Sequence, residues 1–292
     1  MATHDQMKSP RGNLTHRGIR DLVVRVAKTA DDCELTGYSA QLAYYFFLSL
    51  FPALLFLTTL IGYLPMAHHH TVLLGFLGRI LPAQAMLLVR RNLESLVHTH
   101  KGGLLSFSAL FALYSAGNAV IAIAAALNRV FGVHEKRPYW RVWAVAVMLI
   151  IALAILLLVA VTLFFFGPWL VTMLATQFGW ALVPAVLDVV RWPVILGALI
   201  MATALVYHFA PDVRQEWRWV SPGVVFSVSG WLAASALFAF YVDHFGSYNR
   251  MYGSIGAVIV LLTWMYLSGL VLLVGGGINA VLAGAHDPSG HR

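Results

Sequence analysis

The chain has 292 residues, of which 60% are hydrophobic and only 11% charged, whereas an average soluble domain carries about 25% charged residues. This deficit excludes a large soluble domain and predicts an all-α, polytopic membrane protein. The formal charge of +7 is better explained by basic residues that orient membrane spans than by binding of nucleic acid. A lone cysteine, Cys33, excludes an intramolecular disulfide.

The N-terminal part is predicted to hold a tail and an interfacial helix. Residues 1–16 are polar and basic, which predicts a disordered tail. In residues 17–30, apolar side chains recur at helical spacing, and Arg20, Arg25 and Lys28 occupy other faces. This pattern is typical of an amphipathic helix on the anionic cytoplasmic leaflet. The alternative is a helix packed on the protein's own inner face.

Six runs are long and apolar enough to cross a bilayer as helices, which requires about 20 residues. The predicted spans are residues 39–64, 104–127, 142–166, 192–209, 223–242 and 255–274. Gly167 and Pro168 are predicted to end the third span, which is the most apolar and is expected to face lipid. Together the spans form a single membrane domain, residues 17–283, followed by a polar tail, residues 284–292.

Polar side chains inside or bordering the first two spans are the first candidate site. In the first span, polar residues share one helical face with Pro52. Because polar groups in hydrocarbon need partners or water, this face is predicted to point into the bundle, where it lines a cavity or packs against another helix. The candidate cavity-lining residues are Gln41, Tyr44, Tyr45, Ser49, Pro52, Asn118 and Asn128.

The long connection between the first two spans, residues 65–102, is predicted to lie outside the cell and to contain amphipathic helices. It contains His68–His70, and His98 and His100 follow. Adjacent histidines in a loop lack the i, i+4 geometry of a helical metal site, and no cysteine or paired carboxylate accompanies them. No metal site is therefore predicted.

The later spans carry the candidate gate or coupling residues. Asp188 and Arg191 are three residues apart and can pair on one helical face. Both placements of this pair, inside the hydrocarbon or just outside it, remain open. A polar loop, residues 243–253, is predicted to connect the last two spans, with two tyrosines as anchors or gate residues. The full candidate set is Asp188, Arg191, Asp243, Tyr248, Tyr252 and Asn279.

The distribution of basic residues predicts the orientation of the chain. Thirteen of the 19 Lys and Arg residues lie on the side of the N-terminus, five lie on the other side, and Arg191 is unassigned. The positive-inside rule therefore predicts that both termini are cytoplasmic.

No catalytic or nucleotide-binding motif occurs in the sequence. A GxxxxGK[ST] phosphate loop, an HExxH pair and a GxSxG elbow are all absent. Nuclease chemistry would need clustered carboxylates or histidines with ligand spacing, and no local spacing of this kind is present. The sequence therefore predicts a protein that is not an enzyme and has no cofactor.

Four segments taken together resemble one family. AQLAYYFFLSLFPALLFL, ALNRVFGVHEKRP, YHFAPDVRQEWRWVSPG and FGSYNRMYGSIGAVIVLLTWMYLSGLVLLVGGGINA occur in this order. From Arg17 to Ala283 the chain resembles the YihY family, also called the BrkB virulence-factor family, of bacterial inner-membrane proteins. The resemblance implies six spans, cytoplasmic termini and a location in the inner membrane.

The resemblance also implies a function and further residues. Members have been labelled ribonuclease BN, which these residues do not support, and have been linked to transport of envelope lipid or lipopolysaccharide. The family pattern falls on Glu135 and Arg137 as a cytoplasmic motif. Where the family commonly has an acid near the end of the last span, this chain has Asn279.

The resulting functional prediction is a transporter or flippase-like carrier of a lipid or other amphipathic envelope component. Its expected partners are membrane lipids and an envelope lipid or lipopolysaccharide-related substrate, with no nucleic acid. Transport would be passive or coupled to an ion gradient. The alternative is a non-transporting scaffold for an envelope complex.

Overall fold

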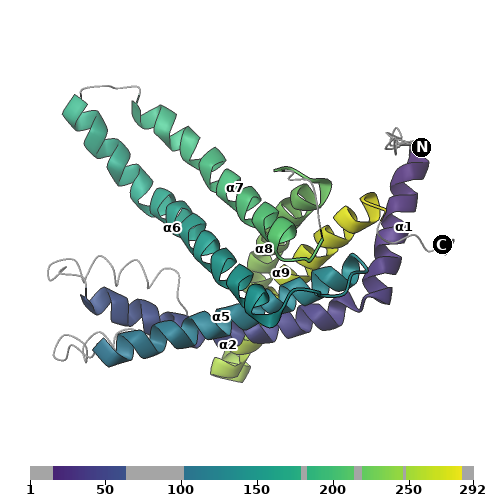
Figure 1. Cartoon of the computed structure of the whole chain (residues 1–292). Coiled ribbons are helices and arrows are strands. Elements are labelled where there is room, and N and C mark those ends of the chain that lie inside the picture. The colour runs from purple at the N-terminus through teal and green to yellow at the C-terminus, as the bar shows by residue number, and fades with distance from the viewer. Residues whose placement is uncertain (1–15, 64–101, 179–182, 214–218, 246–247, 285–292) are drawn as a thin grey trace, which may run out of the picture.

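The computed structural model describes residues 16–63, 102–178, 183–213, 219–245 and 248–284. Its helices are α1 (His16–Asp32), α2 (Leu35–Tyr63), α5 (Gly102–Val130), α6 (Tyr139–Phe178), α7 (Val183–Phe209), α8 (Pro222–Phe245) and α9 (Tyr248–Leu282) (Figure 1). Within these residues there is no strand, so the all-α prediction is confirmed. The predictions for the tails and for the histidine-containing connection concern residues 1–15, 64–101 and 285–292, which lie outside the described residues.

Six of these helices contain a stretch that is long and apolar enough to cross a membrane. The stretches are Leu35–Phe56, Ser106–Val130, Tyr139–Val161, Val189–Phe209, Pro222–Val242 and Val258–Leu282. Since helices satisfy all backbone hydrogen bonds internally, they can cross a bilayer where other structures cannot. The prediction of a polytopic membrane protein with six spans is therefore confirmed for the part of the chain that the structure describes.

The spans pack as pairs. Helix α2 packs against α5, α6 against α7 and α8 against α9, and α2 also packs against α9. In Figure 1 the α2–α5 pair and the α6–α7 pair lie together at one end and diverge toward the other. Helix α5 is the most buried candidate span and α6 the least. The exposed side chains of α6, such as Ile155 and Leu158, agree with a span that faces lipid.

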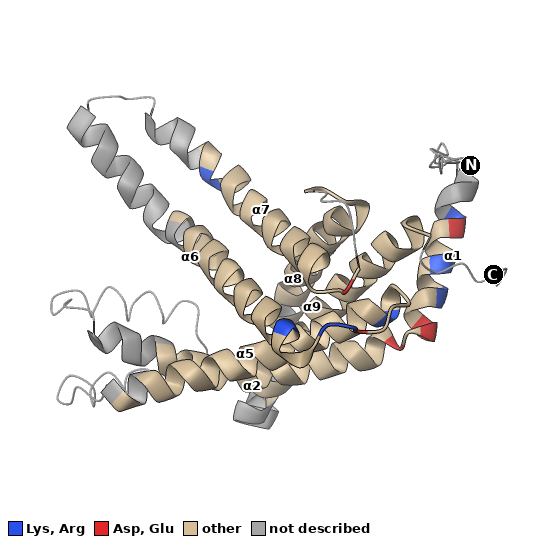
Figure 2. Cartoon of the chain, viewed as in Figure 1, with Lys and Arg blue, Asp and Glu red and all other residues tan. Residues whose placement is uncertain are grey.

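Helix α1 and the end of α9 lie at the same end of the bundle, and Figure 2 shows the described charged residues gathered there. At this end α2, α6 and α8 begin and α5, α7 and α9 finish. Among the charged residues that the structure describes in the spans, Arg191 near the start of α7 lies away from it. This is the charged end of the bundle, and its composition suits a membrane–water boundary.

Helices α5 and α6 approach each other closely near the charged end. The ring of Tyr114 stacks on that of Trp143, with centroids 5.8 Å apart and planes inclined by 13°. Gly117 makes room for the indole, because a Cβ atom there would overlap the Trp143 ring. Small residues permit such close approach between membrane helices, so this contact fixes where the two helix pairs come together.

Helix α1 meets α2 at a sharp corner at the charged end (Figure 1). Glu34 has a φ of 54°, in the left-handed region that turns the chain after a helix. Cys33 is buried, and its thiol donates a hydrogen bond to the carbonyl oxygen of Arg129 at 3.7 Å. Val23 and Val24 are 61% and 59% exposed. Helix α1 thus packs on the protein through one side and leaves apolar side chains outside, and its contact with lipid remains a prediction.

Two predicted boundaries are wrong. Helix α6 continues through Gly167 and Pro168 to Phe178, so these two residues do not end the helix as predicted, although its candidate span is Tyr139–Val161. Helix α8 ends at Phe245 and α9 begins at Tyr248, so most of the predicted loop at residues 243–253 is helical. Near hydrocarbon, backbone groups must be bonded internally, and this requirement outweighs the tendency of glycine and proline to end a helix.

Candidate functional site

Helices α7, α8 and α9 meet at a close crossing near the charged end. The hydroxyl groups of Tyr207 and Ser227 are hydrogen-bonded to each other at 2.5 Å. Tyr207 also donates to the carbonyl oxygen of Leu272 at 2.5 Å. A Cβ atom on Gly275 would overlap the Ser227 hydroxyl, and one on Gly223 would overlap the carbonyl oxygen of Gly275. Glycine at both positions therefore allows α8 and α9 to touch backbone to backbone, as small residues do in membranes.

Asn279 completes this crossing. Its side-chain oxygen accepts a hydrogen bond from the backbone N–H of Gly223 at 2.9 Å. The first N–H groups of a helix have no partner within it, and Gly223 is the second residue of α8. Asn279 therefore caps α8 from the neighbouring helix. Its predicted role as a gate or coupling residue is not tested by this contact.

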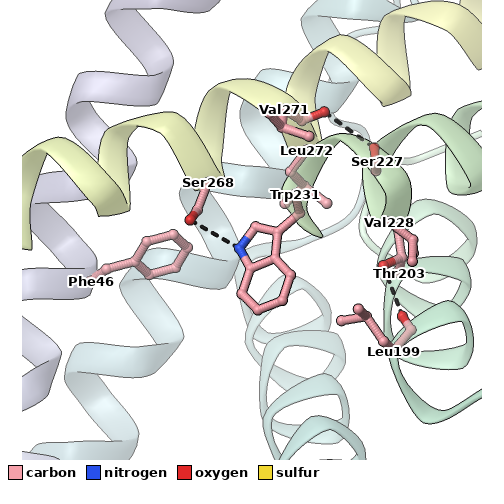
Figure 3. Close-up of a pocket in the computed structure, with 9 residues that line it drawn as sticks. All are labelled: Phe46, Leu199, Thr203, Ser227, Val228, Trp231, Ser268, Val271 and Leu272. Atoms are coloured by element: carbon pink, nitrogen blue, oxygen red, sulfur yellow. Dashed lines mark hydrogen bonds between the residues drawn. The ribbon is translucent and has the colours of Figure 1, made fainter. Parts of the chain in front are cut away.

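A cavity of about 190 Å³ lies beside the crossing. Phe46 of α2 and Leu199 of α7 border it, and Trp231 of α8 extends into its middle (Figure 3). The nine lining residues are Phe46, Leu199, Thr203, Ser227, Val228, Trp231, Ser268, Val271 and Leu272. All of them fall within the candidate spans. The fold thus places a partly open hollow at the depth of the membrane, where four helices meet.

The polar atoms that line this cavity are bonded within the protein. The Thr203 hydroxyl donates to the carbonyl oxygen of Leu199 at 2.9 Å. The indole N–H of Trp231 donates to the Ser268 hydroxyl at 3.1 Å, and that hydroxyl donates to the carbonyl oxygen of Trp264 at 2.9 Å. Because these groups are satisfied, the surface that the cavity offers to a ligand is mainly hydrocarbon.

A second feature, the polar cluster, lies at the charged end and consists of Asn128, Glu135, Arg137 and Asp212. Arg137 binds Glu135 with two parallel hydrogen bonds, Nε to Oε1 at 2.8 Å and Nη2 to Oε2 at 2.7 Å. The Asn128 amide donates to Glu135 Oε2 at 2.9 Å and accepts from the backbone N–H of Asp212 at 2.7 Å. The bidentate pairing fixes both orientation and spacing.

The polar cluster ties two connections together. Arg137 donates to the carbonyl oxygens of Phe209 at 3.3 Å and Ala210 at 2.8 Å, where α7 ends and carbonyl groups lack helical partners. The backbone N–H of Lys136 donates to Asp212 Oδ2 at 3.0 Å. The α5–α6 connection is therefore held against the end of α7 by a positive charge, which also suits the helix dipole there.

Hydrogen bonds from Arg137 lower the pKa of Glu135, because they favour its ionised form, while partial burial opposes them. The same pairing raises the pKa of Arg137. A carboxyl with a lowered pKa stabilises the fold fully above its unfolded pKa, and this contribution is lost as the pH falls through the folded value. The cluster should therefore weaken in acid, below the ordinary pKa of 4.5.

Substituting Glu135 with glutamine is expected to remove this acid sensitivity. The wild-type melting temperature in detergent should fall as the pH is lowered from 5 to 3, roughly the range in which a paired carboxyl is titrated. The Glu135→Gln protein should melt at a lower temperature at pH 7 and show a shallower loss over that range. Equal slopes for the two proteins would contradict a stabilising role for the ionised carboxylate.

The structure places the predicted cavity-lining residues in several different settings. Gln41 and Tyr44 are exposed, Tyr45 is half-buried and Pro52 is buried inside α2. The Ser49 hydroxyl donates to the carbonyl oxygen of Phe46, and the Asn118 amide donates to that of Tyr114. Asn128 joins the polar cluster with Glu135 and Arg137. None of the seven is among the residues that line the cavity, and their role in transport remains a prediction.

The predicted coupling residues are spread over three helices. Arg191 lies in α7 with its guanidinium 5.5 Å from the centre of the Trp192 ring. The backbones of Asp188, Asp243, Tyr248 and Tyr252 are helical, but their side chains lie outside what the structure describes. Their contribution to gating or coupling remains a prediction.

Several residues of both features were not singled out from the sequence. Ser227 and Trp231 are four residues apart on α8, as are Leu199 and Thr203 on α7, so each pair lies on one helical face. That spacing could have indicated a shared lining face, although residues that pack against a neighbouring helix have the same spacing. Asp212 had no local signal, because its partner Asn128 is 84 residues away in the chain.

The described residues contain no group of three or more His, Cys, Asp or Glu side chains that could hold a metal ion. In the polar cluster, the carboxylates of Glu135 and Asp212 are instead held by Arg137, the Asn128 amide and the backbone N–H of Lys136. The polar cluster therefore holds the α5–α6 connection against the end of α7 and the residues that follow it.

Comparison with known proteins identifies the family. The family model for virulence factor BrkB matches residues 26–292. The chain is 42% identical over 246 residues to the putative ribonuclease-like protein YfkH of Bacillus subtilis, covering 84% of this chain and 88% of that protein. It is 26% identical over 220 residues to a UPF0761 membrane protein of Paraburkholderia xenovorans, covering 73% of this chain and 48% of that protein. No solved structure matches. A profile match over most of the chain, together with the extended similarity to YfkH, shows that this protein belongs to the BrkB virulence-factor family.

Proposed function

We propose that the protein is a carrier in the bacterial inner membrane that moves a lipid or another amphipathic envelope component across the bilayer. The observation that supports this proposal is the partly open cavity at membrane depth, lined from α2, α7, α8 and α9. Ligand sites of helical membrane proteins lie between helices and combine apolar walls with few polar groups. Movement would be passive or coupled to an ion gradient, with Asp188, Arg191 and Asp243 as the groups to test for coupling.

We also propose that the charged end faces the cytoplasm. It carries basic side chains from α1, from the end of α5, from the α5–α6 connection and from the start of α6, including Arg25, Arg129 and Arg141 (Figure 2). Cytoplasmic boundaries are enriched in Lys and Arg. A reporter fused after Arg292 that is active only outside the cytoplasm would overturn this orientation.

A second candidate function is a membrane scaffold for an envelope complex. It is favoured by the way polar side chains in the spans are used. Asn118, Ser49 and Thr203 each bond to a carbonyl group on their own helix, as side chains do when they only need a partner in hydrocarbon. A scaffold would need the bundle but not the cavity, so the two functions differ in their dependence on that space.

The name of the Bacillus relative raises ribonuclease activity as a third possibility. We propose that this chain is not an enzyme of that kind. Hydrolysis of RNA needs carboxylates or histidines that can hold a metal ion or transfer a proton. The carboxylate of Glu135 is instead committed to Arg137 and Asn128.

Filling the cavity is expected to slow transport. Leu199→Trp adds an indole at the wall between α7 and α2, and should reduce transbilayer movement of fluorescent phospholipids in liposomes by about tenfold, or about 1.4 kcal/mol in the barrier. The matched control is Leu196→Trp, the same change three residues earlier on α7, where the side chain is exposed and does not line the cavity.

The control should retain the wild-type rate. If wild-type protein accelerates no lipid class, the carrier proposal is wrong and the scaffold is favoured. If both variants slow transport equally, the cavity is not on the route. Monodisperse elution of both variants from a size-exclusion column establishes that a lower transport rate is not caused by misfolding.

A further inference from the structure

The cavity has the chemistry of a site for hydrocarbon. None of its nine lining residues is charged, and the hydroxyl and indole groups among them are bonded to carbonyl groups or to one another. What projects into the space is therefore methyl, methylene and ring surface. A polar ligand would lose its hydrogen bonds to water on entry and find no free side-chain donor among the lining residues in return.

Water does not suit this space either. A buried water molecule typically makes about three hydrogen bonds to groups that otherwise lack partners, and the donors among the lining side chains already have acceptors. An empty space would forfeit dispersion contacts on every wall. Apolar cavities of about 150 Å³ accept a ring of six carbon atoms, so a cavity of 190 Å³ has room for a similar or slightly larger number.

The position of the cavity indicates which apolar molecule can reach it. Its lining comes from the candidate spans of α2, α7, α8 and α9, and the cavity is partly open. In a bilayer, the molecules that surround those spans are lipids, and their acyl chains occupy this depth. The volume fits a segment of one chain, and the uncharged lining offers a charged headgroup no ionic partner.

We propose that the cavity binds one acyl chain of a bilayer lipid and leaves the headgroup outside. This inference rests on the proposed function and deepens it, because it names the part of the carried molecule that the protein holds. The site selects by shape: hydrocarbon gains no hydrophobic free energy when it moves from lipid to an apolar pocket, so fit between surfaces must supply the affinity.

Trp231 gives the site a fixed shape. Its indole N–H is bonded to Ser268 at 3.1 Å, and its ring packs edge-on against Trp264 with centroids 6.0 Å apart. The Trp264 N–H is bonded in turn to Ser235 at 3.4 Å. These contacts hold the ring in one orientation, and a held ring can discriminate between chains that differ in branching or in the position of a double bond.

Photolabelling in liposomes tests the site. The full-length protein is reconstituted with a phosphatidylcholine that carries a diazirine within one acyl chain, illuminated and digested for mass spectrometry. Label is expected on Val228, Trp231 and Leu272, in addition to background label on the exposed positions Leu232 and Leu237. A phosphatidylcholine with the diazirine in its headgroup should label none of the cavity residues.

Leu199→Trp should reduce acyl-chain label in the cavity about tenfold relative to Leu237, because the added indole replaces the chain's contacts, whereas Leu196→Trp should leave the ratio unchanged. Val271→Phe blocks the same space from α9 and serves if Leu199→Trp does not fold. Cavity label that matches the exposed background and ignores both blocking substitutions would overturn the site, as would label from the headgroup probe.

The outcomes separate the site from the transport proposal. Cavity label without transbilayer movement supports the acyl-chain site and refutes the carrier. Transbilayer movement without cavity label refutes the acyl-chain site and leaves the carrier to be explained by another route.

Discussion

Replacing Gly275 with alanine is expected to be the most damaging glycine-to-alanine change among the glycines that the structure describes. The new Cβ would overlap the Ser227 hydroxyl and would lie 2.5 Å from the Tyr207 hydroxyl and 2.7 Å from the Gly223 carbonyl oxygen. The helices would have to separate, which breaks the bonds between Tyr207, Ser227 and Leu272. Overpacking and the loss of a buried hydrogen bond together cost about 2–6 kcal/mol, a large part of the stability of a typical protein.

Gly277→Ala is the matched control, two residues further along α9. Its Cβ would lie 4.0 Å from the nearest atom, a methyl group of Val130, which is an ordinary contact. Alanine is also the better helix former, by up to about 1 kcal/mol. Thermal unfolding in detergent should therefore show a large loss for Gly275→Ala and none for Gly277→Ala. Equal melting temperatures would mean that α8 and α9 do not cross at Gly275.

The crossing shows what the sequence could and could not reveal. The run of glycines at residues 275–277, near the end of the last span, is by itself an indication of a close helix contact. It could not reveal that Gly275 and Gly276 face other helices closely while Gly277 has space. Which glycine touches which helix depends on how α7 and α8 are rotated, and rotation is decided by packing across the bundle.

The six spans were predictable because hydropathy is a local property. Each span carries its own signal of length and composition, so helices of the right number and order followed. Helix boundaries were less predictable, as at Gly167 and Pro168, which lie within α6. A local signal for ending a helix competes there with the need to keep backbone groups bonded near lipid, and the sequence does not state which prevails.

The cavity was not predictable, for a related reason. The polar residues of α2 were predicted to line a cavity because polar groups in hydrocarbon need partners or water. The cavity is bordered instead by residues such as Leu199 and Val271, which look like ordinary lipid-facing or core positions. A cavity leaves no pattern in the sequence, because it forms where the side chains of four helices do not fill the space between them.

The polar cluster was partly predictable from the sequence. Glu135 and Arg137 are two residues apart and were singled out together through the resemblance to the family. Asn128 was predicted to line a cavity and instead contacts both Glu135 and Asp212. Glu135 is seven residues from Asn128, but Asp212 is 84 residues away and follows the end of another helix, so the sequence around Asn128 did not indicate this second partner.

Arg137→Ala is expected to loosen the charged end of the bundle. It removes the bidentate bond to Glu135 and two bonds to the carbonyl oxygens at the end of α7. The Arg137 and Glu135 side chains are 17% and 31% exposed, so water can replace part of what is lost. Hydrogen bonds to charged groups contribute about 1.5–3 kcal/mol, and partial solvent access places the expected loss near the lower end. Thermal unfolding at pH 7 measures it.

Two further variants distinguish the hydrogen bonds of the Arg137 guanidinium group from a general effect of positive charge. Arg141→Ala removes an exposed positive charge from the start of α6, where the side chain lies over the Trp140 ring at 5.1 Å, and should change stability by no more than about 0.5 kcal/mol. Arg137→Lys keeps the charge but lacks the planar fork that matches a carboxylate, so it should recover less than half of the loss. If Arg137→Ala melted like Arg141→Ala, or if lysine restored full stability, the α5–α6 connection would be held to α7 by net charge and not by the geometry of the guanidinium group.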